Sequence, residues 1–232
     1  MDLHNIREDY KFDSLLEANL LENPFDQFKD WFETYQLLRL KDANAMAIAT
    51  VDANNLPHNR IVLLKEVREQ GFVFFTNYAS DKGQQLLHNP NISALFFWRE
   101  QERQVRITGT VSKLENKDNT SYFSTRPYLS QIGAAASQQS QEIEDRIALE
   151  AKFEAFQQQH PEGSDVPKPE SWGGFLITPQ SFEFWQGRSG RLHDRIIYSP
   201  EGQGWKTKRL QPKGSGKKKC LPKEGILIRY KS

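Results

Sequence analysis

The chain is poor in cysteine and has no long apolar run. Its 232 residues include a single cysteine, Cys220, which excludes an internal disulfide and any structural zinc cluster built on cysteines. No apolar stretch reaches the roughly 18 residues of a membrane-spanning helix, and the charged N-terminus has no apolar segment typical of a signal peptide. We therefore expect a cytoplasmic protein without a membrane partner.

An excess of one charge is also missing. The 31 Lys and Arg residues nearly balance the 30 Asp and Glu residues, and the net charge is +1 at pH 7. Such a chain has no overall field that would attract nucleic acid, so an anion site must be local. Neither the glycine motif of dinucleotide-binding folds nor that of P-loop proteins is present. The five histidines lack metal-ligand spacing, and we predict no metal site.

The chain does contain enough apolar residues for a folded core, with 37% hydrophobic and 12% aromatic residues. Asn23 and Pro24 are typical of a helix start, and an aromatic stripe follows from Phe25 to Tyr35. Runs of β-branched and aromatic residues then predict strands at 45–52, 59–67, 72–77, 92–100 and 103–115. Short connections between these runs favour an antiparallel sheet or barrel.

Helices and a hairpin are predicted in the rest of the chain. They are a helix from Ser80, a helical region at 117–159 broken near Arg126, a strand at 172–187 and a hairpin at 194–210. Within the helical region, apolar and charged residues of 141–159 alternate as in an ordinary amphipathic helix.

The two ends of the chain differ in composition from its middle. Residues 1–22 begin with a polar stretch, and we expect a mobile N-terminal segment there. Residues 23–212 carry the strand and helix patterns of one folded domain. Residues 213–232 contain Gly-Ser-Gly and a triple lysine and resemble a linker or translated vector, so we expect a non-native or disordered basic tail.

Basic residues recur where predicted strands end and helices begin. Arg60 and Lys65 are five apart in one predicted strand, which places them on opposite faces of it. Lys82 lies at a predicted helix N-terminus, where backbone N–H groups already favour an anion. A solvated surface charge is the simpler interpretation of each residue taken alone.

A second polar cluster follows in the helical region. Tyr122 and Arg126 are four apart and would share a helix face, and Ser130 lies close by in the sequence. A phenol, a guanidinium and a hydroxyl form a typical phosphate grip, because arginine makes paired charged hydrogen bonds to phosphate oxygens. Two separate clusters on a chain of net charge +1 indicate two bound anions.

The stretch WQGRSGRLHDR, residues 185–195, is too polar for a core and too dense in functional groups for an ordinary surface. It holds three arginines, a tryptophan, an aspartate and His193. Its glycines allow the backbone to turn, so that side chains from both ends of the stretch can converge.

Several motifs resemble the pyridoxamine 5′-phosphate oxidase family in order and spacing: RIVLLK, FFTN, SDK, ERQVRITG, YFSTRP, SQIGA, QQS, WGGF, EFWQG and RLHDR. The resemblance covers about residues 5–212. It implies an α+β, mainly antiparallel fold, the FMN-binding split β-barrel of Greek-key type with flanking helices. It also implies a homodimer with FMN at the subunit interface.

The activity implied by the resemblance is FMN-dependent oxidation of pyridoxamine or pyridoxine 5′-phosphate to pyridoxal 5′-phosphate. A hydride would pass to flavin N5, and O2 would reoxidise the flavin to give hydrogen peroxide. Two alternatives stay open: a related split-barrel flavin reductase with another substrate, and a non-catalytic binder of pyridoxal phosphate or flavin. The joint presence of Tyr122, Arg126 and Ser130 with the RLH motif argues against the first alternative.

The resemblance also implies roles for individual residues. FMN would be bound by Arg60, Ile61, Val62, Leu63, Leu64, Lys65, Phe75, Thr76, Lys82, Gln104, Gln139, Ser140, Trp185 and Arg195. The substrate would be bound by Arg7, Tyr10, Lys65, Tyr122, Arg126, Ser130, Arg191, Leu192 and His193. Of these, Arg191 and His193 would be the catalytic residues, acting by position and electrostatics.

Within this resemblance the N-terminal segment would act as a lid, with Arg7 and Tyr10 closing over the pocket. Two positions depart from the family pattern. Asp81 stands where the family usually has arginine, beside the expected FMN phosphate, and would either face solvent or weaken FMN binding. Phe75 replaces the commoner tyrosine, which removes a hydroxyl and keeps the ring.

Overall fold

The computed structural model describes residues 1–5 and 9–212, so Arg7 and the expected tail at 213–232 lie outside the described residues. The strands are β1 (Ala45–Val51), β2 (Pro57–Leu63), β3 (Glu66–Arg68), β4 (Gly71–Asn77), β5 (Asn91–Trp98), β6 (Arg103–Lys113), β7 (Trp172–Gln186), β8 (Asp194–Glu201) and β9 (Gly204–Arg209). The α-helices are α1 (Pro24–Gln36), α2 (Asp81–His88), α3 (Asn116–Ser124), α4 (Tyr128–Ala136) and α5 (Arg146–Gln159). Short 3-10 helices occur at Glu17–Asn19, Arg99–Gln101 and Ser189–Arg191.

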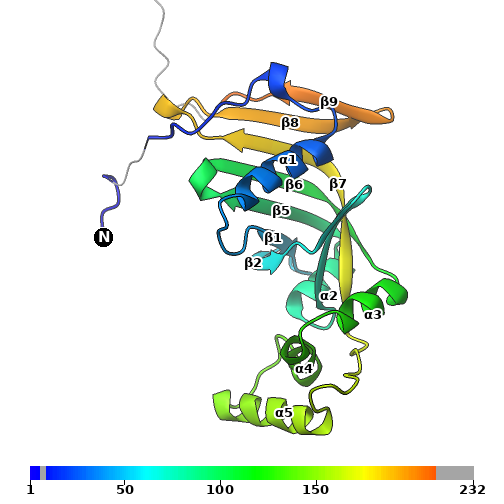
Figure 1. Cartoon of the computed structure of the whole chain (residues 1–232). Helices are drawn as coiled ribbons and strands as arrows, with labels where there is room; N and C mark the ends of the chain where they lie inside the picture. The colour runs from blue at the N-terminus through cyan, green and yellow to red at the C-terminus, as the bar shows by residue number, and fades with distance from the viewer. Residues whose placement is uncertain (6–8, 213–232) are drawn as a thin grey trace, which may run out of the picture.

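The strands form one curled antiparallel sheet (Figure 1). Their order is β2-β1-β5-β6-β7-β4-β3, and β8 and β9 continue from β7. One edge of β7 pairs with β6, while the other edge pairs with β4 at 172–177 and with β8 at 182–186. The sheet divides between these two partners, and the predicted antiparallel split β-barrel with flanking helices is confirmed.

A bulge lies beside this division of the sheet. β6 and β7 lose register after Thr108, where Pro179 lies in β7 and Gln180 is left over. A proline fits at such a place because it has no N–H to give to a strand ladder. The barrel closes on its other side at Lys65, whose N–H donates to the Val73 carbonyl at 2.8 Å.

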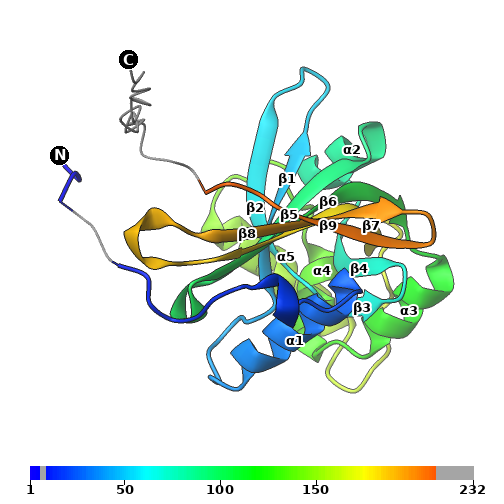
Figure 2. The ribbon, with the colours of Figure 1, turned by 90° about the horizontal axis from the view of Figure 1, so that it is seen from above.

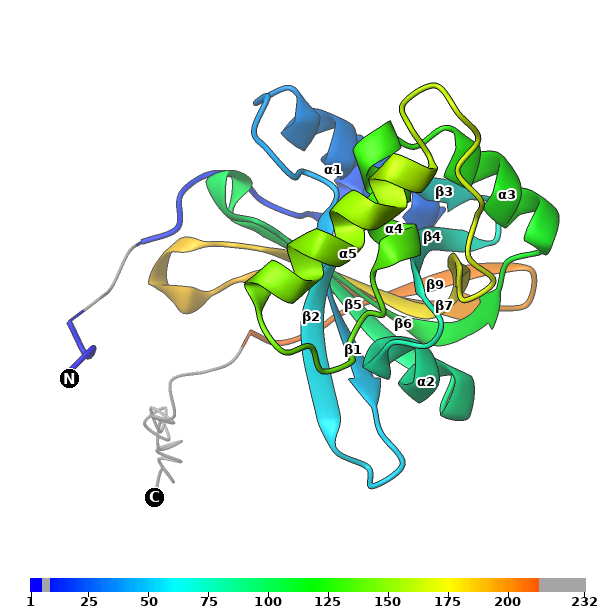
Figure 3. The ribbon, with the colours of Figure 1, turned by 90° about the horizontal axis from the view of Figure 1, so that it is seen from below.

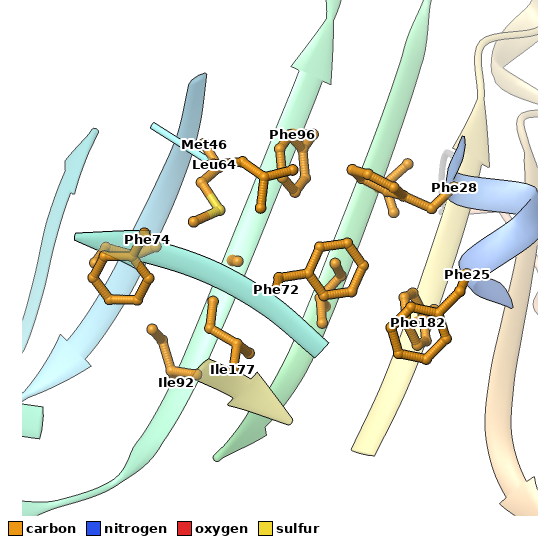
Figure 4. Close-up of a cluster of buried hydrophobic side chains, with 14 of the residues drawn as sticks. Phe25, Phe28, Met46, Leu64, Phe72, Phe74, Ile92, Phe96, Ile177 and Phe182 are labelled. Carbon is orange, nitrogen blue, oxygen red and sulfur yellow. The ribbon is translucent and has the colours of Figure 1, made fainter. Parts of the chain in front are cut away.

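Helix α1 packs against the curled sheet and adds aromatic side chains to its core. The Asn23 Oδ1 accepts a hydrogen bond from the Phe25 N–H at 2.9 Å, and Pro24 is the first helical residue, so the predicted helix start is confirmed. Phe25 and Phe28 reach from α1 into the core (Figure 4). The Phe28 ring is fully buried, and its centroid lies 4.9 Å from that of Phe72 in β4.

The prediction of one strand at 59–67 is wrong, because two shorter strands occupy this stretch. β2 ends at Leu63 and β3 begins at Glu66. Between them the Leu64 side chain turns into the core, where it is 5% exposed, while Lys65 stays exposed. The strand ends because the backbone changes partner here: the Leu64 N–H donates to the Asn44 carbonyl beside β1, whereas the Lys65 N–H donates to the Val73 carbonyl of β4.

Helices α3, α4 and α5 lie at the end of the molecule away from β8 and β9 (Figure 1), with α4 and α5 side by side (Figure 3). The start of the helix predicted at 141–159 is wrong: α5 begins at Arg146, after the Asp145 carboxylate accepts from the Ala148 N–H at 2.7 Å. Its apolar face is also only partly covered, since Ile147 is 74% exposed. Within the described residues, no helix has the length and apolar character needed to cross a membrane.

The described part of the N-terminal segment runs along the barrel toward α1 (Figure 2). The Leu15 N–H donates to an Asp194 carboxylate oxygen at 3.0 Å, and the Leu15 side chain is buried. Glu17 accepts two hydrogen bonds from the Arg209 guanidinium, which lowers the pKa of Glu17 to about 2. These contacts tie the segment to β8 and β9.

Replacing Phe28 by alanine is expected to lower the free energy of unfolding by about 3–5 kcal/mol, because it removes a fully buried ring between α1 and the sheet. Denaturant unfolding at a fixed protein concentration measures the change. Leu37→Ala is the control, since that side chain is 81% exposed and its loss should change the unfolding free energy by no more than about 0.5 kcal/mol. Similar losses from both substitutions would contradict the packing of α1.

Candidate functional site

A pocket of about 670 Å³ opens where β2 and β4 meet α2, α3 and α4. We call it the cationic pocket, because Arg60, Lys65, Lys82 and Arg126 all line it. Most of the residues predicted to bind FMN or the substrate phosphate lie on its wall: Arg60, Ile61, Val62, Leu63, Lys65, Phe75, Thr76, Lys82, Tyr122, Arg126, Ser130 and Gln139.

Arg60 and Lys65 both line this pocket, together with Ile61, Val62 and Leu63 between them, so residues from both faces of this stretch contribute to it. The continuous strand predicted from Arg60 to Lys65 is interrupted, since β2 ends at Leu63.

Lys82 is held at the first turn of α2 by neutral oxygen atoms. Its Nζ donates to Gln139 Oε1 at 2.8 Å, Thr76 Oγ1 at 3.2 Å and Ser80 Oγ at 3.3 Å. The Ser80 side chain also caps α2, as the sequence predicts, by accepting from the Gly83 N–H at 3.3 Å. Lys82 thus combines its own charge with the N–H groups of a helix N-terminus, which favours an anion.

Arg60 faces the same corner from β2. Its guanidinium donates to Thr50 Oγ1 and, at 3.1 Å, to Gln85 Oε1. Burial lowers the pKa of Arg60, and burial followed by repulsion from Arg60 lowers the pKa of Lys82. No ion pair joins either cation to a carboxylate in the part of the chain that the structure describes. Two partly buried cations without a counter-ion fit the phosphate of a bound cofactor.

Asp81 and Ser140 border this corner. The Asp81 N–H donates to Ser140 Oγ at 3.2 Å, while the Asp81 side chain is exposed. Its carboxylate contributes only a secondary electrostatic effect, which raises the pKa of Arg60 and Lys82. Ser140 adopts a φ of 72°, which an L-residue rarely does without a local reason.

Arg126 forms a second cationic corner of the pocket. Its Nη1 is buried and is the one buried side-chain nitrogen or oxygen among the described residues that lacks a hydrogen-bond partner. Its Cζ lies 4.9 Å from the centre of the Trp172 ring and 5.6 Å from that of Phe123. Burial lowers the pKa of Arg126, as expected for a cation with no paired carboxylate.

Tyr122 and Phe75 form the aromatic wall beside Arg126. Their rings are stacked with centroids 4.1 Å apart and an interplanar angle of 18°. Burial raises the pKa of the Tyr122 phenol, and Arg126 acts in the opposite direction. Ser130, from α4, is an exposed hydroxyl on the same wall. The grip predicted from Tyr122, Arg126 and Ser130 is thus assembled around one cavity, and its ligand stays a prediction.

Three further predicted FMN residues, Gln104, Trp185 and Arg195, lie elsewhere, on the outer face of the sheet. Strand register places Gln104 opposite Trp185 and Trp185 opposite Arg195. Phe97, which is 54% exposed, lies opposite Gln104 on the same face. We call Gln104, Trp185 and Arg195, together with Arg191 and His193, the outer-face cluster.

His193 is held in one tautomer by the backbone. Its Nδ1 accepts a hydrogen bond from the Arg188 N–H at 3.1 Å, so the proton of the neutral ring lies on Nε2. Burial, and then the charge of Arg191, lowers the pKa of His193. The ring packs between Trp185 and Tyr10, with centroids 4.7 and 5.3 Å away. His193 is therefore a neutral hydrogen-bond donor at Nε2.

Glu183, which the sequence analysis missed, orients Arg195. The glutamate is buried, and its Oε1 accepts from Arg195 Nε at 2.8 Å, while Oε2 pairs with Arg106. A signal for it is present, since the EFWQG motif places Glu183 two residues before Trp185 and hence on the same face of β7. The sequence alone does not reveal that two arginines share it.

Three predicted residues stand apart from both groups. The Leu64 side chain is buried in the core, so any cofactor contact there would be through its backbone. Leu192 is 71% exposed, and Arg7 lies outside the described residues.

The cationic pocket and the outer-face cluster lie at opposite ends of β7. Trp172, the first residue of the strand, lines the pocket. Trp185 follows near the far end of this 15-residue strand, which corresponds to about 40 Å along it. One copy of the chain therefore does not bring the two halves of the predicted site together.

Comparison with known proteins assigns the chain to a family. A model described as pyridoxamine 5′-phosphate oxidase matches residues 33–160, and one described as pyridoxine 5′-phosphate oxidase C-terminal dimerisation region matches residues 172–212. The chain belongs to the pyridoxamine 5′-phosphate oxidase family. The family predicted from the sequence motifs is thereby confirmed, and the second match indicates a dimerising enzyme.

Relatives and two solved structures match most of the chain. Proteins named pyridoxine/pyridoxamine 5′-phosphate oxidase from Haemophilus influenzae and Neisseria gonorrhoeae are 49% and 48% identical over 91% of this chain and 100% of their own length. PhzG from Burkholderia lata, solved with tetrahydrophenazine-1-carboxylic acid, is 31% identical with a TM-score of 0.80, covering 86% of this chain and 98% of PhzG. A related FMN-binding protein from Nostoc punctiforme shares the fold, with 16% identity and a TM-score of 0.65, over 83% of this chain and 100% of its own.

Arg126→Met is expected to leave the free energy of unfolding unchanged or to raise it by up to about 1 kcal/mol, because the wild-type residue buries an unpaired N–H. Arg103→Met is the matched control, since the buried Arg103 pairs with Asp13 at 2.9 Å and donates to Gln186. That substitution should lower the unfolding free energy by about 3 kcal/mol. Denaturant unfolding compares the two variants, and a loss above about 1 kcal/mol for Arg126→Met would contradict the interpretation of Arg126 as an unsatisfied cation.

Proposed function

We propose that the protein is an FMN-dependent oxidase that converts pyridoxamine 5′-phosphate or pyridoxine 5′-phosphate to pyridoxal 5′-phosphate. The observation that carries the proposal is the cationic pocket, whose two corners each hold partly buried positive charge without a paired carboxylate among the described residues. Two separate phosphates, one of the cofactor and one of the substrate, would satisfy both corners.

The corner of Arg60 and Lys82 fits the FMN phosphate. Its cations converge with the start of α2 and with the neutral oxygens of Thr76 and Gln139. When bound, FMN would supply the hydride acceptor at N5 and return its electrons to O2, giving hydrogen peroxide. Asp81 is exposed beside this corner, which supports the interpretation that it faces solvent and leaves the phosphate to the two cations.

The corner of Arg126 fits the substrate phosphate. Arg126 would donate charged hydrogen bonds from its unpaired guanidinium, and the hydroxyls of Tyr122 and Ser130 and the ammonium of Lys65 line the same cavity. Binding energy at the phosphate, far from the reacting carbon, would fix the substrate ring in place.

Arg191 and His193 would act on the substrate ring by position and charge. Because His193 Nδ1 already accepts from the backbone, the neutral ring offers a proton at Nε2 and no free lone pair. It would donate a hydrogen bond to the substrate instead of removing a proton as a base. Arg191 adds a fixed positive charge two residues away, with an unusual φ of 62° that sets the direction of this turn.

A second copy of the chain would complete the site. The outer face of the sheet exposes Ile61 (64%), Phe97 (54%) and Leu63 (37%), and the first and last of these also line the cationic pocket. A two-fold dimer that buries this apolar face would place the outer-face cluster of one copy beside the pocket of the other. FMN would then lie at the subunit interface.

A related split-barrel enzyme acting on another substrate is the second candidate, since PhzG was solved in complex with tetrahydrophenazine-1-carboxylic acid. The cluster of Tyr122, Arg126 and Ser130 on one cavity wall favours a phosphate ester instead. A non-catalytic binder would need the same groups of the cationic pocket, and only a test of turnover distinguishes it from an oxidase.

The proposal predicts a yellow protein whose visible flavin absorbance disappears when pyridoxamine 5′-phosphate is added under anaerobic conditions and returns when air is admitted. Unphosphorylated pyridoxamine, at the same concentration, is the control and should bleach the flavin far more slowly, because the Arg126 corner has no anion to hold. An unchanged spectrum with the phosphate ester would identify a binder and overturn the proposed activity.

Mixed dimers test the shared site. Arg126→Ala and Arg191→Ala should each lower kcat/KM by more than about tenfold, which corresponds to about 1.4 kcal/mol of lost transition-state stabilisation. Random dimers of the two variants should regain about a quarter of wild-type activity, because half of the dimers are mixed and each then has one intact site. No regain on mixing would place both residues in the site of one copy, and an effect of Arg191→Ala below about threefold would remove it from catalysis.

A further inference from the structure

Arg126 differs from Arg103 and Arg195 in having no carboxylate partner. Arg103 pairs with Asp13 at 2.9 Å, and Arg195 pairs with Glu183 at 2.8 Å. Arg126 makes no ion pair with any described residue, and its Nη1 is the buried atom that lacks a partner. Something other than a counter-ion must hold this guanidinium in the pocket.

The face of the Trp172 ring holds the Arg126 guanidinium. The Arg126 Cζ lies 4.9 Å from the centre of the Trp172 ring, within the range of a cation–π contact, and Phe123 adds a longer contact at 5.6 Å. An aromatic face attracts a cation without using its N–H groups and without cancelling its charge. A carboxylate in the same place would occupy the N–H groups and cancel the charge, and it would compete with an incoming anion.

Trp172 is itself fixed on several sides. It is 5% exposed and begins β7, where it pairs with Asn77 of β4. Its ring is stacked on Phe75, with centroids 5.1 Å apart and an interplanar angle of 9°. Phe123 meets it edge-on at 5.0 Å. A ring held in this way presents one fixed surface to the pocket.

We propose that Trp172 is a positioning residue for phosphate recognition: it holds Arg126 by its ring face, so that the guanidinium keeps its charge and its N–H groups for the substrate phosphate. This inference rests on the proposed function of the cationic pocket and deepens it. Trp172 does not touch the reacting atoms, and its effect on the substrate passes through Arg126.

Trp172→Leu is the main test, because leucine is apolar but has no ring face. We expect the KM for pyridoxamine 5′-phosphate and the Kd for pyridoxal 5′-phosphate to rise about tenfold, the size of one partly desolvated cation–π contact. The value of kcat should change by less than about threefold, since the phosphate contact is the same in ground and transition states. The Kd for pyridoxal without phosphate should stay unchanged.

Trp172→Phe keeps a smaller ring and is expected to raise the same constants by about threefold, since tryptophan is the stronger partner in cation–π contacts. This variant decides the question if the leucine variant does not fold. Trp98→Leu is the control for stability: Trp98 is 1% exposed and stacks on Tyr35, away from the cationic pocket. It should lower the melting temperature and leave KM and both Kd values unchanged.

Unchanged binding of pyridoxal 5′-phosphate in both Trp172 variants would overturn the inference, as would a loss that is equal for pyridoxal with and without its phosphate. The wild-type protein separates this failure from that of the proposed function. If wild type is not reduced by pyridoxamine 5′-phosphate, the proposed activity fails; if wild type turns over while the variants bind phosphate normally, the role of Trp172 alone fails.

Discussion

The pairing of β7 with three other strands is the constraint on which the rest of the structure depends. Its shared register with β4 puts Trp172 beside Phe75, and its register with β6 and β8 puts Trp185 between Gln104 and Arg195. Because a strand is stiff along its length, these two groups cannot approach each other within one chain. The bulge after Thr108 marks the point where the strand passes from one group of neighbours to the other.

Uncompensated positive charge is the second organising feature. The net charge of +1 does not reveal this feature, because the carboxylates of the chain pair with other arginines, namely Arg103, Arg195 and Arg209. The cations of the pocket are held instead by hydroxyls, amides and ring faces. Such neutral supports keep a cation in place while leaving its charge available to a ligand.

Local signals were enough to predict much of the fold and part of the site. The cap at Asn23, the cap at Ser80 and the strand runs act through neighbours in sequence, and they appear where expected. The strand prediction failed at Leu64 because the backbone there changes from a partner beside β1 to one in β4, and the helix prediction failed before Asp145 because that side chain caps a later start. Roles that depend on long-range register were out of reach of the sequence.

Glu183 and Trp172 illustrate that limit. Each lies within 13 residues of a predicted site residue along the sequence, yet its partners come from other strands or helices.

The separation of the cationic pocket from the outer-face cluster along β7 also has a kinetic consequence for a shared site. An isolated chain would carry two half-sites and no whole one, so the activity per chain would fall on dilution as dimers dissociate. The concentration of the protein would then set its activity per chain.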